Sequence, residues 1–577
     1  MSNFDRILIY YKRYWGKLVL GCICVLFTAI VGLLAPKIIS LTIDDLHLQI
    51  TQKKLVTYGL LILGVATLRG VFLFSQRWIL VVMSRDIEND VRNDYYEHLQ
   101  KLPLDFFQQN RVGDLMARAT NDLNAVRMLV GPAIMYFLNT IVVSLVAIPV
   151  MITISLKLTI LVLISFLGVS LVTNFFSTQI HDRFEKIQEH FSSITAKAQE
   201  NLTGVRVIRA YVRENYEVEK FGELNKEFVD RNLGLIKIQA LFGPILRSLV
   251  GIGSILTLWY GGNLVANNSI TLGKFVEFNL YLTLLIWPMI ALGYVISLYQ
   301  RGMASLKRIN AILNTEITIK DEGKTYLSEI KGVIEFRNLT FSYKDKAVLK
   351  NINLKIESGQ TIAIVGHTGS GKSTLINLIP RLFEASKGML FIDGYQIQDI
   401  PLSLLRQGIG YVPQDTFLFS ETIAGNIAFG VNNLDAKDIH QAAQQAGLLV
   451  DIEAFPKQFD TIVGERGITL SGGQKQRTAI ARALIRQPKI LILDDSLSAV
   501  DTETEERILG HLQNVMSGRT SIIVSHRIST VKMADLIIVL SDGEIVERGT
   551  HESLIMRGGA YAELYEKQLL EEELAAT

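Results

Sequence analysis

Cysteine is nearly absent from this sequence: its 577 residues include only Cys22 and Cys24, and both lie in one apolar stretch. Two cysteines so close together cannot form a disulfide framework or a cysteine-ligated metal site. Positive and negative charges are nearly balanced: the sequence has 58 Lys and Arg and 56 Asp and Glu, which gives a formal net charge of +2. We therefore expect no overall attraction to nucleic acid and a reducing cytoplasm around the polar segments.

The sequence also lacks a clear secretory signal peptide. Basic residues, among them Lys12, Arg13 and Lys17, precede an apolar run, as they do in signal peptides. The run is about twenty residues or longer, however, which exceeds a signal-peptide core, and no small-residue cleavage site follows it. We expect it to be retained as a membrane span.

Long apolar runs are abundant in the first half, and 49% of the whole chain is hydrophobic. Runs of this length are typical of helices that cross a bilayer. The six expected spans are Leu18–Ile39, Val56–Val82, Ala133–Ile154, Leu158–Phe176, Phe242–Val265 and Phe275–Leu298.

Basic residues predict the orientation of these spans. They concentrate before the first span and in the two long connections, Ser84–Arg127 and Thr178–Lys237. Positively charged connections stay in the cytoplasm, so we expect the N-terminus and both connections there. An even number of spans returns the chain to the same side, which places everything after Leu313 in the cytoplasm. The protein is expected in a bacterial cytoplasmic membrane.

The second half has a different pattern. Short β-rich runs alternate with helical segments, which is typical of an α/β domain, and the polar stretch Glu316–Lys331 separates the two halves. The expected organisation is a helical membrane domain at residues 1–315, a linker at 316–332 and an α/β domain at 333–570.

A phosphate-binding loop lies in the second half. Residues Gly366–Ser373 match G-x-x-x-x-G-K-S, between an apolar strand and a helix. Glycines let backbone N–H groups surround phosphates, and the helix N-terminus adds positive potential. Lys372 is expected at the β- and γ-phosphates and the Ser373 hydroxyl at Mg²⁺. Asp494, at the end of the apolar strand in "KILILDDS", is expected beside the same ion.

Further motifs identify a resemblance. "LSGGQKQR" at Leu470–Arg477 resembles the signature of ATP-binding cassette (ABC) proteins, which distinguishes them from other P-loop ATPases. "FFQQNRVGDLMARATND" at Phe106–Asp122 is similar to the first intracellular loop of six-span ABC exporters. The resemblance covers nearly the whole chain. It implies a six-span membrane domain fused to an ATP-binding cassette.

The resemblance also implies roles for single residues. Tyr343 is similar to the aromatic residue that stacks on adenine, Gln414 to the glutamine that reaches Mg²⁺ and the attacking water, and His526 to the histidine at the γ-phosphate. Asp501 ends a stretch that resembles the D-loop, and Thr461–Gly467 resembles the exporter X-loop.

The expected site residues form four groups. The ATP contacts are Tyr343, Gly366, His367, Thr368, Gly369, Ser370, Gly371, Lys372, Ser373 and Thr374. The Mg²⁺ ligands are Ser373, Gln414 and Asp494. The catalytic residues are Asp495, His526 and Gln414. The signature residues that would complete a partner's site are Leu470, Ser471, Gly472, Gly473 and Gln474.

Asp495 departs from the family pattern, in which glutamate follows the aspartate of this strand. The shorter carboxylate lies about 1.5 Å further from the water that it would activate, the length of one C–C bond. This predicts slow hydrolysis at the chain's own site. A degenerate site combined with an intact signature resembles one half of a bacterial heterodimeric multidrug ABC exporter, which implies a partner subunit that carries the glutamate. The alternative is a homodimer in which Asp495 works as the base.

The leading function is ATP-driven export of an amphipathic molecule by a dimer, because the family's site is shared between two cassettes. An ATP-gated regulator or channel on the same fold is the alternative. A soluble chromosome- or repair-type ATPase is excluded by the spans, and an importer is disfavoured because its spans and cassette usually occupy separate chains. The cargo is open among drug-like amphiphiles, lipids and peptides.

Two sets of residues are expected to serve transport. Short coupling segments are expected near Gln109–Asp114 and Ala210–Asn215. Ionisable groups inside spans are costly and usually face the bundle interior or a cavity, so the candidate substrate contacts are Arg69, Arg247, Glu277 and the neighbouring Tyr281.

Overall fold

The computed structural model describes residues 3–48, 51–321, 323, 325, 327–344, 346–431, 435–464, 467–495, 510, 513, 515–525 and 527–576. The chain divides into two compact units. The first comprises Met1–Gln100 and Val112–Thr315, and the second comprises Lys101–Arg111 and Glu316–Thr577.

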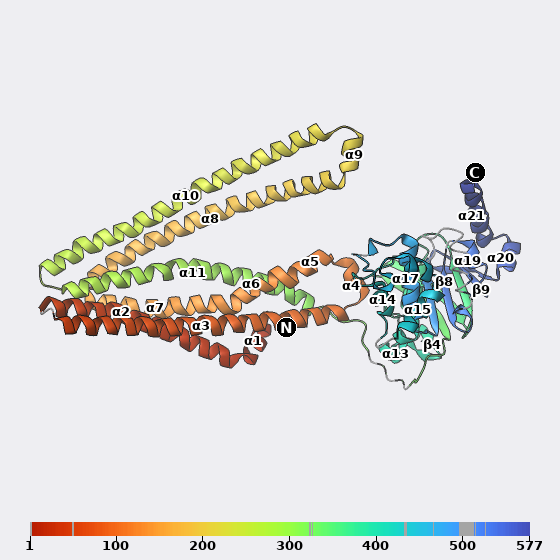
Figure 1. Cartoon of the computed structure of the whole chain (residues 1–577), viewed down its shortest axis with the longest axis horizontal. Helices are drawn as coiled ribbons and strands as arrows, with labels where there is room; N and C mark the ends of the chain where they lie inside the picture. Colours follow the sequence, from red (N-terminus) through yellow and green to blue (C-terminus); the bar gives the residue numbers. More distant parts are fainter. Residues whose placement is uncertain are drawn as a thin grey trace. The chain divides into compact units, whose positions relative to one another are not determined.

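The first unit consists of helices. Their bounds are α1 Asn3–Arg13, α2 Trp15–Leu48, α3 Gln52–Lys101, α5 Val112–Ala117, η1 Arg118–Asp122, α6 Leu123–Met128, η2 Leu129–Ala133, α7 Ile134–Ile154, α8 Leu156–Thr203, α9 Val205–Ala210, α10 Glu214–Ala266 and α11 Leu272–Leu313. Helices α8 and α10 run side by side and are joined at one end by α9 (Figure 1).

Among the described residues, five helices are long and apolar enough to cross a membrane: Trp15–His47, Gln52–Lys101, Val112–Ile154, Glu214–Ala266 and Leu272–Leu313. They contain five of the six expected spans. The remaining one lies in α8, whose described apolar segment, Leu156–Ser165, is shorter. The span expected at Leu158–Phe176 therefore stays a prediction.

The helices extend well beyond the apolar runs and end only at residues that favour the end of a helix. Ser155 caps α8, since its hydroxyl accepts the N–H of Leu158, and Gly204 ends that helix. Thr271 caps α11 in the same way, accepting from the N–H of Lys274. Side-chain oxygens at these positions satisfy N–H groups that have no partner inside the helix.

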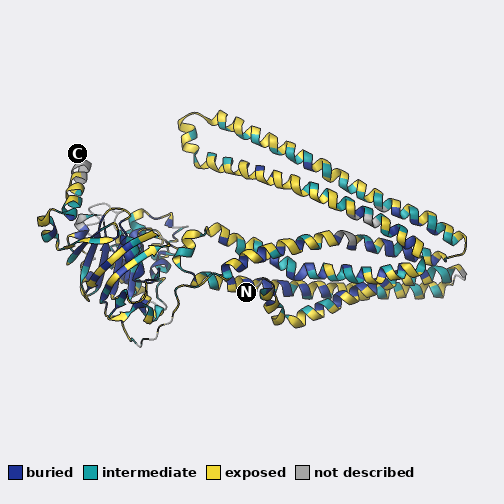
Figure 2. Ribbon diagram, turned by 180° about the vertical axis from the view of Figure 1, so that it is seen from behind, coloured by how far each residue is buried: buried dark blue, intermediate teal, exposed yellow. Residues whose placement is uncertain are grey.

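The short helices of the two long connections lie slightly earlier than the expected coupling segments. Helix α4, Leu104–Gln109, begins after Pro103, and α9 begins directly after Gly204. Proline and glycine are the local helix breakers here, and the coupling role of the expected segments stays a prediction. In Figure 2, exposed residues cover most of α9 and of the adjoining parts of α8 and α10.

A buried cluster holds α2, α7, α8 and α11 together. It includes Leu33, Ala147, Leu158, Phe278 and Leu285, each exposed by 5% or less. Burying such side chains contributes roughly 1.5–3 kcal/mol each when the alternative is water. Inside a bilayer that term is weak, so close packing and polar contacts between helices add to it.

The second unit contains two sheets. The strands are β1 Ile334–Tyr343, β2 Lys346–Ile356, β3 Thr361–Val365, β4 Leu390–Ile392, β5 Tyr395–Gln396, β6 Ile409–Val412, β7 Ile490–Asp494, β8 Thr520–Val524, β9 Leu536–Ser541 and β10 Glu544–Gly549. One sheet has the order β2-β1-β4-β5 and the other β10-β9-β3-β8-β7-β6. In the larger sheet β3, β6, β7, β8 and β9 run parallel, and β10 is antiparallel at the edge.

Helices of the second unit surround these sheets. They are α4 Leu104–Gln109, α12 Lys372–Leu378, η3 Ile397–Asp399, α13 Leu402–Gln407, α14 Ile423–Ala428, α15 Ala436–Gln445, α16 Leu449–Ala454, η4 Gln458–Asp460, α17 Gly472–Leu484, α19 Ile528–Val531, α20 His551–Arg557 and α21 Ala560–Ala576.

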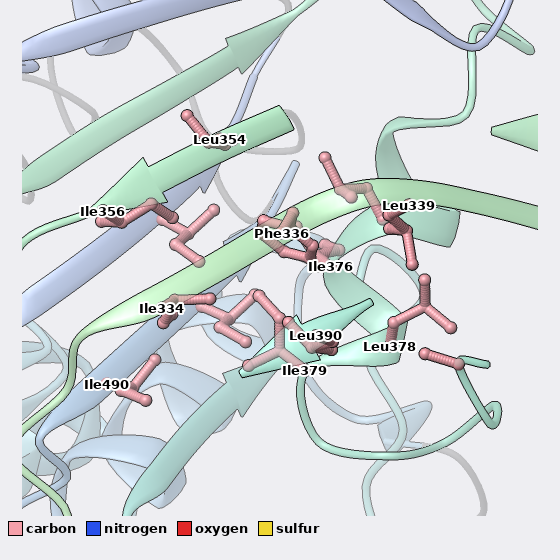
Figure 3. Close-up of a cluster of buried hydrophobic side chains, with 14 of the residues drawn as sticks. Ile334, Phe336, Leu339, Leu354, Ile356, Ile376, Leu378, Ile379, Leu390 and Ile490 are labelled. Atoms are coloured by element: carbon pink, nitrogen blue, oxygen red, sulfur yellow. The ribbon is translucent and has the colours of Figure 1, made fainter. Parts of the chain in front are cut away.

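The core between the two sheets fixes helix α12. Ile376 and Ile379 lie among Ile334 and Phe336 of β1 and Leu390 of β4, and all five are nearly fully buried (Figure 3). Buried strands that pack on both faces are expected to be continuously apolar, as "TIAIV" of β3 and "ILILD" of β7 are. The fold is thus the expected one: a helical membrane domain followed by an α/β domain with a P-loop.

Candidate nucleotide-binding site

The loop between β3 and α12 needs glycine at two positions. Gly366 has φ 149° and Gly371 has φ 102°, both in the region that L residues rarely adopt. A Cβ on Gly366 would also clash with the carbonyl oxygen of Leu540 in β9, and one on Gly371 would lie 2.9 Å from the Leu349 side chain. The backbone can therefore curl tightly around a phosphate without obstruction.

Lys372 lies inside this loop. Its side chain is 7% exposed, and its ammonium group donates to the carbonyl oxygens of Gly366, at 2.8 Å, and His367, at 2.9 Å. Burial lowers the pKa of Lys372, and the nearby carboxylates of Asp494 and Asp495 oppose that shift. The loop thus holds a cation where the phosphate chain of a nucleotide would enter.

The larger sheet brings Asp494 to the start of α12. Ile364 of β3 and Asp494 of β7 both pair with Val524 of β8, so the three residues lie in one row across the sheet. The Ser373 hydroxyl donates to Asp494 at 3.2 Å. Burial raises the pKa of Asp494, the negative charge of Asp495 raises it further, and the Ser373 hydrogen bond and Lys372 lower it.

These two oxygens suit a magnesium ion. Ligands next to each other in an octahedral Mg²⁺ site, each at 2.0–2.1 Å, lie about 2.9 Å apart, close to the Ser373–Asp494 distance. The described residues contain no group of three or more His, Cys, Asp or Glu that could hold a metal. Mg²⁺ is commonly bound by one or two carboxylates together with substrate phosphates.

Tyr343 lies beside the same helix. Its hydroxyl is 3.4 Å from the hydroxyl of Thr374, and its ring packs edge-on against Phe341 and Phe383, with centroids 5.1 Å away in each case. The structure therefore joins Tyr343, Ser373, Thr374 and Asp494 through α12. A stacking role for Tyr343 stays a prediction.

Gln414 and Asp495 follow the ends of neighbouring strands. Gln414 is exposed two residues after β6, which is parallel to β7. Asp495 directly follows β7, donates its N–H to the Val524 carbonyl at 2.8 Å and has φ 43°. Aspartate is among the few residues that tolerate this left-handed conformation, so the local backbone favours Asp495 independently of any catalytic role.

The signature residues form the start of α17. Ser471 caps this helix: its hydroxyl accepts from the Gln474 N–H, and the Gln474 side chain accepts from the Ser471 N–H. Ser471 and Gly472 are exposed, and Leu470 is buried beneath them. An exposed helix N-terminus of this kind can bind an anion. No hydrogen bond or ion pair among the described residues joins it to the phosphate loop of the same chain.

Asp451 in α16 is a residue that our sequence reasoning missed. One of its carboxylate oxygens accepts from the Gln474 side chain at 3.0 Å, and the other accepts from Arg477 at 2.9 Å. It therefore anchors the first turn of α17 from a neighbouring helix. An acid in a short helix carries no signal of this role, because the contact depends on how α16 and α17 pack.

Two expected residues, His526 and Asp501, lie outside the described part of the chain. The X-loop prediction is likewise described only in part, at residues 461–464 and 467.

The four candidate substrate contacts have different surroundings. Glu277 is 1% exposed, its carboxylate oxygens have no hydrogen-bond partner in the described part, and Lys37 of α2 lies 3.9 Å away. The Tyr281 hydroxyl donates to the Leu33 carbonyl at 2.9 Å. Arg247 is exposed on α10. Arg69 lines a cavity between helices.

An apolar helical unit joined to a P-loop domain with a capped signature helix defines the class of protein: a membrane-bound ATPase that couples ATP hydrolysis to transport. Family models agree with both parts. Residues 18–289 match the ABC transporter transmembrane region, and residues 349–498 match the ABC transporter model.

Similar proteins extend the match to nearly the full length. The chain is 38% identical over 566 residues to "Probable multidrug resistance ABC transporter ATP-binding/permease protein YheI" of Bacillus subtilis (strain 168), covering 97% of each chain. It is 34% identical over 575 residues to the ATP-dependent lipid A-core flippase of Syntrophus aciditrophicus (strain SB), covering 100% of this chain and 96% of the other.

A solved structure shows the same fold: a bacterial Atm1-family ABC exporter with ATP bound has a TM-score of 0.77 and 27% identity, covering 97% of this chain and 98% of that one. The chain belongs to the ABC transporter family, as the resemblance of its motifs predicted. It is a multi-pass membrane protein whose cassette binds nucleotide.

Replacing Asp494 by Asn tests the cost of its buried charge. Because the folded-state pKa of Asp494 is raised, the ionised form destabilises the fold at neutral pH, and this cost disappears as the pH falls and the carboxyl is protonated. Without nucleotide, Asp494→Asn should raise the unfolding temperature of the cassette, measured in the full chain at pH 7.5, by roughly 2–4 °C for each 1 kcal/mol. The gain should shrink towards acidic pH.

Asp399→Asn, at an exposed position of the same unit, is the matched control and should leave the unfolding temperature unchanged. A lower unfolding temperature of Asp494→Asn at every pH would contradict the assigned cost.

Proposed function

We propose that this chain is one half of a dimeric ABC exporter of a bacterial cytoplasmic membrane and moves an amphipathic molecule, drug-like or lipid, outward. The observation that carries the proposal is the apolar helical unit on the same chain as a P-loop cassette with its signature helix. The names of the similar proteins, a multidrug resistance transporter and a lipid A-core flippase, support this substrate class.

The proposed site is shared by two cassettes. Lys372 would hold the β- and γ-phosphates, and Ser373 and Asp494 would hold Mg²⁺, which would offset the negative charge of the phosphates. The exposed N-terminus of α17 supplies N–H groups to the γ-phosphate bound by the partner. Its capping box and the Asp451 contacts keep those N–H groups in position, which supports a role in trans.

The Lys372 assignment can be tested by binding. Lys372→Ala removes a cation that makes charge-assisted hydrogen bonds, and the affinity for Mg-ATP should fall more than about tenfold. The measurement is equilibrium nucleotide binding to the purified full chain, with its unfolding temperature as a check on folding. Lys387→Ala, at an exposed lysine of the same unit, should bind normally. Undiminished binding by Lys372→Ala would refute the assignment.

The proposed orientation places both termini and both long connections in the cytoplasm. Asn268 lies in the short loop between α10 and α11, and Arg213 lies between α9 and α10. In a background without Cys22 and Cys24, a membrane-impermeant maleimide should label Asn268→Cys in intact cells. It should label Arg213→Cys only after permeabilisation. Labelling of both in intact cells would overturn the orientation.

We further propose that the partner is a different chain and that the site on this chain's phosphate loop hydrolyses ATP slowly. A general base must lie within hydrogen-bonding distance of the water that it activates. The carboxylate of Asp495 extends about 1.5 Å less far from the backbone than that of a glutamate. A misplacement on the order of 1 Å can lower the rate roughly a hundredfold. The intact, capped signature helix means that this chain can still complete a partner's site.

The ATPase rate of the chain alone, compared with that of the chain expressed with its partner, tests this asymmetry. Weak turnover alone and strong turnover with the partner are expected, and mutation of the partner's glutamate should abolish the latter. Asp495→Asn should then change the heterodimer's rate little. Robust turnover by the homodimer that Asp495→Asn abolishes would instead establish Asp495 as a working base.

A further inference from the structure

A cavity of about 230 Å³ lies between α2, α3, α7 and α11 of the membrane unit. Its inner wall is buried and includes Thr28, Leu33 and Val143, whereas Arg69 and Trp287 lie at its exposed edge. The volume is below the 300–1,000 Å³ typical of sites that enclose a whole drug-sized ligand. It suits one end of a longer molecule.

Among the described residues, Arg69 is the single ionisable side chain that lines this cavity. The guanidinium stem packs along Gly32 of α2, because a Cβ on Gly32 would lie 2.9 Å from Nε of Arg69. No carboxylate among the described residues lies within ion-pair distance of it. Glu277, the acid buried in α11, is instead 3.9 Å from Lys37.

Among the polar side chains that line the cavity, counting Arg69, donors without a partner outnumber acceptors. Thr28 and Thr283 already donate their hydroxyl protons to carbonyl oxygens of their own helices, at 2.7 Å to Cys24 and 3.0 Å to Asn279. The Asn139 amide and the Trp287 indole N–H, like Arg69, make no hydrogen bond in the described part of the chain. Arginine and indole can only donate, so the complementary group is an acceptor with negative charge.

We propose that this cavity binds the anionic headgroup, phosphate or carboxylate, of a single membrane-borne amphiphile whose apolar chain extends past Trp287. An unpaired arginine within a membrane helix is costly, and an anion bound in a site of low dielectric offsets that cost. Planar guanidinium groups bind phosphate and carboxylate through two parallel hydrogen bonds. This inference rests on the proposed export of amphiphiles and narrows it to anionic ones.

The test measures binding of dodecyl phosphate to the full chain in nanodiscs of zwitterionic lipid. Dodecyl phosphate should bind more than about tenfold tighter than dodecyltrimethylammonium. Arg69→Gln should weaken the binding of dodecyl phosphate by a similar factor, and Arg69→Lys should weaken this binding less. Gly32→Ala should also weaken it, because the added methyl group displaces the guanidinium.

Arg77→Gln is the matched control, since Arg77 is an exposed arginine of the same helix outside the cavity lining. The affinity of this variant for dodecyl phosphate should stay at the wild-type value. The unfolding temperature of each variant in the nanodisc should stay at the wild-type value, which shows that it is folded. If Arg69→Gln does not fold, Arg69→Lys and Gly32→Ala decide the question.

Equal affinity for the phosphate and ammonium amphiphiles, or undiminished affinity in the Arg69 and Gly32 variants, would overturn the site. Inorganic phosphate that competes as well as dodecyl phosphate would overturn its assignment to an amphiphile. Export is measured separately, as ATP-dependent uptake of dodecyl phosphate into inside-out vesicles. Binding without uptake would contradict the proposed function and leave the site standing.

Discussion

The parallel pairing of β3, β8 and β7 is the constraint on which the nucleotide site depends. Ser373 and Asp494 are 121 residues apart, yet their side chains meet at 3.2 Å, because Val524 of the middle strand pairs with both Ile364 and Asp494. A one-residue slip of a strand would turn its side chains to the other face. The apolar side chains packed on both sides of these strands hold that register, so core packing and site geometry have the same origin.

Packing in the membrane unit follows different physics. Water is absent from the bilayer core, so the backbone must satisfy its own hydrogen bonds, and long helices achieve this. Polar contacts then add specificity between helices α2 and α11: Asp44 accepts from the Thr271 hydroxyl and the Gly273 N–H at the end of the bundle, and Tyr281 donates to the Leu33 carbonyl further along. The same pair of helices lines the cavity with Arg69.

The phosphate loop and the signature were predictable because each is local. Their glycines, lysine and serine are contiguous, and the backbone conformations that they require are properties of those residues. The short helices α4 and α9 lie next to the expected coupling segments and begin after Pro103 and Gly204, which are local helix breakers. The coupling role of these segments stays a prediction, because it depends on contacts between the two units.

The sequence by itself determined the two-part organisation, five of the six expected membrane spans, the phosphate loop and membership of the ABC transporter family, because these follow from hydropathy and from short contiguous motifs. Only the tertiary structure decided that Asp451 anchors the signature helix, that Glu277 lies near Lys37, and that Arg69 lines a cavity rich in hydrogen-bond donors. Each of these depends on which helix faces which, and periodicity along one helix carries no information about the neighbour that it will meet.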